Sequence, residues 1–245
     1  MSGHSKWATI KHKKGAADAK RGQMFTKLIK EISIAARMGG GDPDSNARLR
    51  TAILKARSSN MPKDNIDRAI KKGTGELEGS NYEELTYEAY APGGIAILIE
   101  VLTDNKNRAA AEVRNLLTRS GGSLATANAV MRLFSRKGVI SLDGEKYTED
   151  KVMELALEAG ADDIVNEDGE IVVYTAPEAF EPVLNAINKA SMETDGAEVS
   201  MIPDVYVDVD KDAGGKIQKL IDKLEESDDV QNVYHNANIP EDIEA

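Results

Sequence analysis

The fold of the first third of the chain is decided by residues 21–73, which read RGQMFTKLIKEISIAARMGGGDPDSNARLRTAILKARSSNMPKDNIDRAIKKG. At the start of this stretch, apolar residues recur at the spacing of one helix face. They are Phe25, Leu28, Ile29, Ile32 and Ala36. The glycines at 39–41 and the Asp42-Pro43 pair that follows predict the end of this first helix.

Two further helices are expected within the same stretch. One runs from about Asn46 to Arg57, and the other starts at Pro62, because proline suits a first helical turn. Gly73 is the expected terminator of the third helix. The basic side chains point away from the apolar faces, which predicts a small three-helix domain with cations on its surface. The spacing does not define a recognition helix for duplex DNA.

The charge of the chain is divided unevenly along its length. Residues 1–72 hold 17 Lys and Arg against 6 Asp and Glu, whereas residues 73–245 hold 14 against 36. The overall pI of about 4.9 averages these two unlike parts. A basic end on an acidic body is typical of an electrostatic handle for phosphates. The alternative is a solvated basic domain with no partner.

Residues 1–20 are predicted to form a basic arm, because apolar residues are sparse there and follow no helical or strand period. Lysines on such an arm can neutralise phosphates and release counterions. We expect phosphate contacts from Lys6, Lys11, Lys13, Lys14, Lys20 and the adjacent Arg21, with Lys27 and Lys30 as further candidates. His12 is a candidate base or sugar contact. Trp7 either stacks on a base or packs against its own domain.

The acidic body reads as hairpins and helices, which indicates α+β domains. Two strands around Ala91-Pro-Gly-Gly94 form a hairpin pattern, and a helix follows at about 106–119. Residues 129–140 read as strand, turn and strand. A final strand at Val230–His235 is expected to return to the sheet of the first hairpin.

The predicted fold class is therefore α+β with three domains: an N-terminal basic three-helix domain followed by two α+β domains, the third inserted in the second. The expected boundaries are a basic arm at 1–20, a helical domain at 21–78, an α+β domain at 79–129 and 204–245, and an inserted α+β domain of ferredoxin-like type at 130–203.

Composition excludes several kinds of chemistry. The chain contains no cysteine, so disulfides, thiol catalysis and Cys-ligated metals are ruled out. No apolar run is long enough to span a membrane, and the first residues lack the apolar segment of a signal peptide. We expect a cytoplasmic protein with no cofactor, no membrane partner and no small-molecule substrate.

Two clusters contain residue types that bind small ligands. Asp208, Asp210 and Asp212 could bind a hard cation, but the pattern favours a solvated strand face that leads into a helix start. Lys106 and Arg108 follow a strand at a predicted helix start, where anions are favoured, and form a possible anion site. The alternative is a helix cap with surface charges. No motif for catalysis or for a metal site is found.

Several long motifs resemble the YebC/PmpR family over essentially the whole chain. They include Ser2-Gly-His-Ser-Lys-Trp7, Asn46-Ala-Arg-Leu-Arg50, Asn60-Met-Pro-Lys-Asp-Asn-Ile66, Thr103-Asp-Asn-Lys-Asn-Arg108 and Asp229-Val-Gln-Asn-Val-Tyr234. The resemblance implies a helical first domain, a third domain inserted in the second, and no enzymatic activity. It also implies either a DNA-binding transcriptional regulator or a ribosome-associated translation factor. The stretch Ala125–Arg132 departs from the family pattern: Ala125 and Asn128-Ala129 stand where the family commonly has glycines and serine, and Met131-Arg132 where an aromatic is usual.

The sequence thus predicts a non-enzymatic regulator of gene expression that binds nucleic acid, either ribosomal RNA on the ribosome or promoter DNA. A loose lysine-rich arm suits irregular RNA, which favours the first target. Two other classes stay open. One is an enzyme or small-anion binder that uses the loop 104–108, and the other is an interaction module whose acidic face binds basic proteins.

Overall fold

The computed structural model describes residues 18–79, 81–167 and 169–240. These residues fall into two compact units. One contains 18–130 and 210–235, and the other contains 131–209 and 236–240. Each unit is described by itself below.

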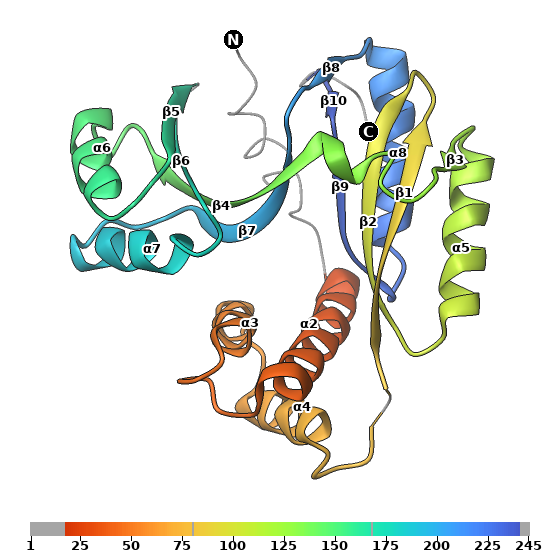
Figure 1. Cartoon of the computed structure of the whole chain (residues 1–245), viewed down its shortest axis with the longest axis horizontal. Helices are drawn as coiled ribbons and strands as arrows, with labels where there is room; N and C mark the ends of the chain where they lie inside the picture. The colour runs from red at the N-terminus through yellow and green to blue at the C-terminus, as the bar shows by residue number, and fades with distance from the viewer. Residues whose placement is uncertain (1–17, 80, 168, 241–245) are drawn as a thin grey trace. The chain divides into compact units, whose positions relative to one another are not determined.

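The first unit begins with three helices that pack around one small core (Figure 1). The long helix α2 contacts both of the shorter helices along its length. Asn46 fixes the turn into α3, because its side chain accepts from the backbone N–H of Leu49 at 3.1 Å and donates to the carbonyl of Ala35 at 2.8 Å. The bounds are α2 Asp18–Gly39, α3 Ala47–Ser58 and α4 Lys63–Thr74.

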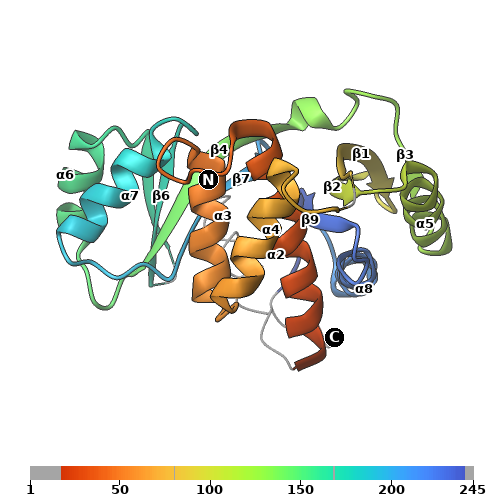
Figure 2. The ribbon, with the colours of Figure 1, turned by 90° about the horizontal axis from the view of Figure 1, so that it is seen from below.

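The same unit continues with an antiparallel sheet in the order β3-β1-β2-β9. Helices α5 and α8 pack beside each other and cover one face of this sheet (Figure 2). The late strand β9 pairs with β2, so the chain returns to the first hairpin after the second unit. The bounds are β1 Glu83–Ala91, β2 Ile95–Thr103, α5 Lys106–Arg119, β3 Ser123–Leu124, α8 Lys211–Glu225 and β9 Val230–His235.

The stretch that departs from the family pattern is held by a carboxylate of β1. The two oxygens of Glu88 accept from the backbone N–H groups of Asn128 at 2.6 Å and Val130 at 2.7 Å. Asn128 has a φ of 64°, a left-handed conformation that asparagine tolerates better than most residues. This loop is therefore fixed through its backbone.

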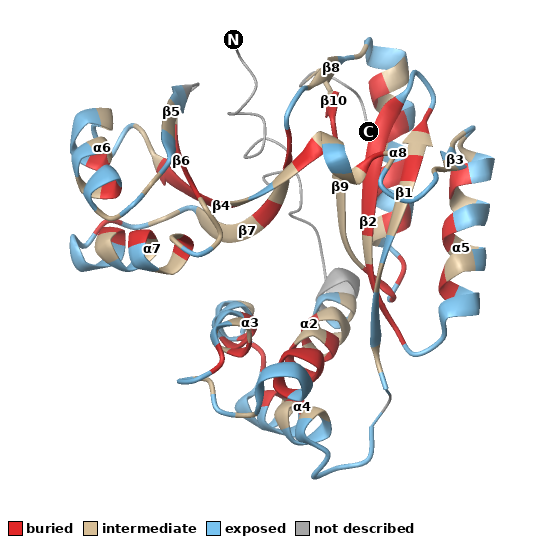
Figure 3. Ribbon diagram, viewed as in Figure 1, coloured by how far each residue is buried: buried red, intermediate tan, exposed pale blue. Residues whose placement is uncertain are grey.

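The second unit is a four-stranded antiparallel sheet in the order β5-β6-β4-β7, with α6 and α7 on one face. The element order βαββαβ and this strand order define a ferredoxin-like arrangement. Figure 3 shows buried residues along β4 and β6 and on one side of each helix. The bounds are η1 Met131–Leu133, β4 Phe134–Asp143, α6 Glu149–Glu158, β5 Asp163–Glu167, β6 Glu170–Thr175, α7 Phe180–Lys189 and β7 Gly196–Pro203; two short strands, β8 Val207–Asp208 and β10 Ala237–Asn238, pair in parallel.

The predicted strand, turn and strand at 129–140 is wrong, because a short 3₁₀ turn leads into one continuous strand, β4. Gly138 lies in the middle of that strand. A Cβ at this position would lie 2.3 Å from Oγ1 of Thr175 and 2.8 Å from Cβ of Phe180. The glycine is therefore required by close packing against neighbours and not by a turn.

The predicted fold class is confirmed: a helical domain is followed by two α+β domains, and the third is inserted in the second.

Candidate nucleic-acid interface

Most of the nucleic-acid contacts that the sequence predicts precede the described residues. Six of the candidates lie outside the described residues: Lys6, Trp7, Lys11, His12, Lys13 and Lys14. Lys20 and Arg21 fall in the first turn of α2, where only the backbone is described. The structure therefore bears on Lys27 and Lys30 alone among the predicted contacts.

Lys27 lies on a second face of α2, away from the three-helix core. Its Nζ donates to the carbonyl oxygen of Glu225 at 2.6 Å, and Nε2 of Gln23 donates to the same oxygen at 3.2 Å. Glu225 ends α8, and the last carbonyls of a helix have no partner within the helix. One face of α2 thus caps the C-terminus of α8.

Lys30 is buried, with only 7% of its surface exposed. Its Nζ lies 2.8 Å from Oδ1 of Asp229, 2.7 Å from the carbonyl oxygen of Asp228 and 3.3 Å from that of Leu102. A lysine ammonium group has three donors, so these three acceptors satisfy it. The structure places the ammonium group of Lys30 inside the unit, where oxygens of the protein itself take up its donors.

Asp229 is the acidic centre of this contact. Besides Lys30, it accepts from Nη2 of Arg108 at 2.8 Å and from Oγ1 of Thr103 at 3.1 Å. Burial by itself raises the pKa of the Asp229 carboxyl, but the hydrogen bonds from Lys30 and Arg108 outweigh burial and hold that pKa below its ordinary value. The carboxylate is therefore charged in the folded protein at neutral pH.

The possible anion site at the start of α5 is occupied by the protein's own carboxylates. Arg108 pairs with Asp104 at 2.9 Å as well as with Asp229, and Lys106 pairs with Glu83. Asn105 caps the helix by accepting from the backbone N–H of Arg108 at 3.0 Å. This arrangement matches the alternative interpretation, a helix cap with surface charges.

A cavity of about 460 Å³ adjoins this loop. Five of its lining residues are acidic and two are basic, so its potential disfavours a small anion. It is lined by Thr26, Lys30, Tyr82, Asp104, Arg108, Glu112, Glu226, Ser227, Asp228 and Asp229.

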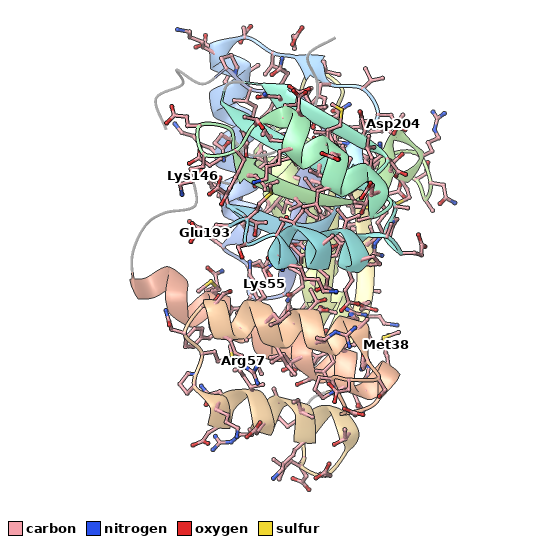
Figure 4. The ribbon with its side chains drawn as sticks, turned by 90° about the vertical axis from the view of Figure 1, so that its left-hand side faces the viewer. Met38, Lys55, Arg57, Lys146, Glu193 and Asp204 are labelled. Atoms are coloured by element: carbon pink, nitrogen blue, oxygen red, sulfur yellow. The ribbon has the colours of Figure 1, made fainter. Side chains whose placement is uncertain are left out.

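Apart from Arg37 at the end of α2, whose guanidinium donates to the carbonyl of Tyr82, the exposed cations of the described helical domain lie on α3 and α4. Figure 4 shows Lys55 and Arg57 projecting from α3. Helix α3 contains four basic residues and no acidic one, and this asymmetry was the signal in the sequence for this surface. Two of its arginines are held within the domain: Arg48 pairs with Glu31 at 2.7 Å, and Arg50 donates to the carbonyl of Pro43 at 2.7 Å. The exposed set is Lys55, Arg57, Lys63, Arg68, Lys71 and Lys72.

The acidic cluster of Asp208, Asp210 and Asp212 lies at the start of α8. Asp210 caps α8 by accepting from the backbone N–H of Ala213 at 2.8 Å. Within the described residues, no group of three or more His, Asp or Glu side chains is arranged to hold a metal ion. None of the helices described is both long and apolar enough to cross a membrane.

A basic three-helix domain joined to an α+β domain that carries an inserted ferredoxin-like domain defines a distinct class of protein. Residues 5–76 match the family description "TACO1/YebC protein N-terminal domain", and residues 82–237 match "TACO1/YebC second and third domain". The chain belongs to the TACO1/YebC family.

Relatives from spirochaetes are similar over the full length. A protein from Treponema denticola is 65% identical over 244 residues, which is 100% of this chain and 99% of that protein. One from Treponema pallidum is 64% identical over 243 residues, or 99% of each chain. Both are named "Probable transcriptional regulatory protein". The fold is similar to the crystal structure of a conserved hypothetical protein from Aquifex aeolicus, with 45% identity, a TM-score of 0.86, and coverage of 98% of this chain and 99% of that one.

Proposed function

We propose that this chain is a non-catalytic, nucleic-acid-binding regulator of gene expression that acts in the cytoplasm through its basic N-terminal part. The observation that carries the proposal is the set of exposed cations on α3 and α4, which adds to the lysines of residues 1–20. Phosphate contacts from such cations supply most of the affinity of proteins for nucleic acids. The relatives' name, a probable transcriptional regulator, agrees with this function.

The favoured target is ribosomal RNA on the ribosome, and promoter DNA is the alternative. Residues 73–245 carry a net charge of −22, which a long duplex would repel. Folded RNA offers separate phosphate clusters, so a basic end can bind while an acidic body stays away from the backbone. A transcriptional regulator would instead prefer particular duplex sites over random DNA.

The test is co-sedimentation of the full chain with ribosomes across a salt series, with excess duplex DNA as competitor. A version that lacks residues 1–20 runs beside it. Six to ten phosphate contacts predict a loss of roughly 10³–10⁵ in affinity between about 50 and 200 mM salt. Sedimentation that depends on the arm and survives the DNA supports a ribosome-bound factor.

Two results would contradict parts of this proposal. If duplex DNA displaces the chain completely from the ribosome, promoter DNA becomes the favoured target. Absence of any salt-dependent binding to RNA or DNA would remove nucleic-acid binding altogether. In that case, retained binding of basic proteins without residues 1–20 would point to an acidic interaction module.

A further inference from the structure

The outer face of α3 differs from its inner face in a way that points to a ligand. Four inner residues are buried in the helical core: Leu49, Ala52, Ile53 and Ala56. The outer residues follow the spacing of one helical stripe. They are Ala47, Arg50, Thr51, Leu54, Arg57 and Ser58.

The charge of this stripe fits a polyanion. The Arg57 side chain is exposed and makes no ion pair or hydrogen bond with the part of the chain that the structure describes. Arg50 lies two turns away and is oriented by the carbonyls of Pro43 and Asp44, at 2.7 and 3.2 Å. No acidic side chain lies on α3 to oppose an anion.

Leu54 lies between these arginines and is 58% exposed. Arg50 precedes it by four residues and Arg57 follows it by three, so the leucine occupies the centre of the basic stripe. Packing a phosphate against Leu54 would desolvate the phosphate without any compensating hydrogen bond. The ligand must therefore bring an apolar surface together with its negative charges.

Unpaired nucleotides have this combination of surfaces. In a duplex the base faces are stacked on one another, and a helix that approaches from outside meets mainly phosphate and sugar. In a loop or single strand the base faces are open and pack on apolar or aromatic side chains. Leu54 is suited to such a base or to the apolar side of its sugar.

Two hydroxyl groups on the same stripe favour RNA over DNA. Thr51 Oγ1 donates to the carbonyl of Ala47 at 3.0 Å, and Ser58 Oγ donates to that of Lys55 at 2.9 Å. Each hydroxyl hydrogen is therefore used within the helix, and the oxygen lone pairs are left to accept. A ribose 2′-hydroxyl supplies a donor for them, whereas deoxyribose does not.

We propose that the outer face of α3 binds an unpaired stretch of RNA, with Leu54 against a base or ribose and Arg57 on a neighbouring phosphate. This inference rests on the proposed nucleic-acid-binding function and adds the kind of strand and the residues that recognise it. The contact differs from that of the lysine-rich arm because it is partly apolar.

The experiment measures the affinity of the full chain for three labelled probes: an RNA hairpin with an open loop, a fully paired RNA of the same length, and the hairpin as DNA. The variants are Leu54→Ala and Arg57→Ala. The matched control is Leu157→Ala, which removes a leucine that is 49% exposed on α6. All three side chains are at the surface, so the variants are expected to fold.

Leu54→Ala should weaken binding to the RNA hairpin about fivefold, the loss expected when a leucine no longer leaves water on binding. Its affinity for paired RNA and its salt slope should stay unchanged. Arg57→Ala should weaken binding to all three probes and lower the salt slope by about one. The Leu157→Ala control should behave as the wild type, and the wild type should bind the DNA hairpin more weakly than the RNA hairpin.

Different failures are distinguishable. If the wild type shows no salt-dependent binding to any probe, the proposed function itself fails. If the wild type binds but Leu54→Ala has the same affinity for the RNA hairpin, the assignment of this face is overturned. The same holds if Leu54→Ala weakens binding to paired RNA as much as binding to the hairpin. Equal affinity for the DNA hairpin would overturn the preference for RNA. Loss of ribosome association by Leu54→Ala, with RNA affinity intact, would assign the face to a protein and overturn the proposal.

Discussion

Helices α2 and α3 belong to the same small domain and both carry cations, but they use them differently. The lysines of α2 that the structure describes point toward the end of α8, where Lys27 and Lys30 donate to carbonyl and carboxylate oxygens. On α3, Arg57 is exposed, and its side chain makes no ion pair or hydrogen bond with the described residues (Figure 4). The count of cations in a helix therefore does not identify a phosphate-binding surface. A cation is available for a phosphate only where the fold has not already placed carboxylate or carbonyl oxygens of the protein beside it.

The largest effect should come from Lys30→Ala. Removing this ammonium group leaves the Asp229 carboxylate, which is 5% exposed, without one of its two cations. Breaking a buried ion pair on one side is strongly destabilising, and we expect a loss of about 3 kcal/mol in the free energy of unfolding. Urea unfolding of the full chain, followed by circular dichroism, measures it.

A double variant sharpens this result. Lys30→Met with Asp229→Leu removes both charges, so part of the lost stability should return, because an apolar pair avoids the cost of an uncompensated charge. If Lys30→Ala unfolds at the same urea concentration as the wild type, the inward role of α2 is contradicted.

The next largest effect is expected in the pH dependence of the free energy of unfolding below neutral pH. The pKa of Asp229 is held below its ordinary value, so its ionised form stabilises the fold above that value, and the stabilisation is lost as the pH falls through the lowered pKa. We therefore expect Asp229→Asn to be less stable than the wild type at neutral pH. The difference should narrow below about pH 4, the ordinary range of an aspartate. Urea midpoints in a pH series measure it, and a gap that stays constant into acid would count against the ion pair.

Lys27→Ala should have a smaller effect. The lysine donates one hydrogen bond to the last turn of α8 and opposes the negative end of that helix dipole, which together amount to about 1 kcal/mol. Lys27→Arg keeps the charge and serves as the control. Hydrogen exchange of the amides near Glu225 reports whether the end of α8 frays in the alanine variant, and unchanged exchange would exclude a capping role.

Arg68→Ala on α4 should have the smallest effect on stability. Its side chain is exposed and makes no ion pair or hydrogen bond with the described residues, so the free energy of unfolding should change by less than about 0.5 kcal/mol. If the outward cations bind phosphates, the salt slope for RNA should still fall by about one. If Arg68→Ala is less stable than the wild type but has the same salt slope for RNA, this outward cation serves the fold and does not bind phosphate.

The sequence predicted the helical core well, because one apolar face is enough to define it. It did not predict the second face of α2, which consists mostly of polar residues. Gln23, Lys27, Lys30 and Ile34 follow one another at helical spacing, and Ile34 is only 2% exposed. An isoleucine outside the main apolar stripe was the available signal that this side of the helix is also covered. The residues that cover this face of α2, near Glu225, lie about 200 residues further along the chain, so no local sequence pattern connects the two.

The strand β4 shows a different limit of sequence patterns. The pattern of residues 129–140 predicted a strand, a turn and a strand, and it gave no reason for a glycine within one continuous strand. The actual cause is steric, since Thr175 and Phe180 occupy the space of a side chain, and those neighbours become known only when β6 and α7 are placed. The candidate site shows the same limit: the sequence separated the basic third from the acidic remainder, but which cations stay exposed depends on distant acceptors.

The contact between α2 and α8 also has a consequence for synthesis on the ribosome. Lys27 leaves the ribosome 198 residues before its acceptor Glu225, a delay of roughly 10 to 40 s at the usual rate of elongation. During that interval the nascent helical domain carries its inward lysines without the acceptors that later satisfy them. The newly made N-terminus is therefore more cationic at its surface than the finished protein. Completion of the chain withdraws Lys30 from any anion that it has met in the meantime.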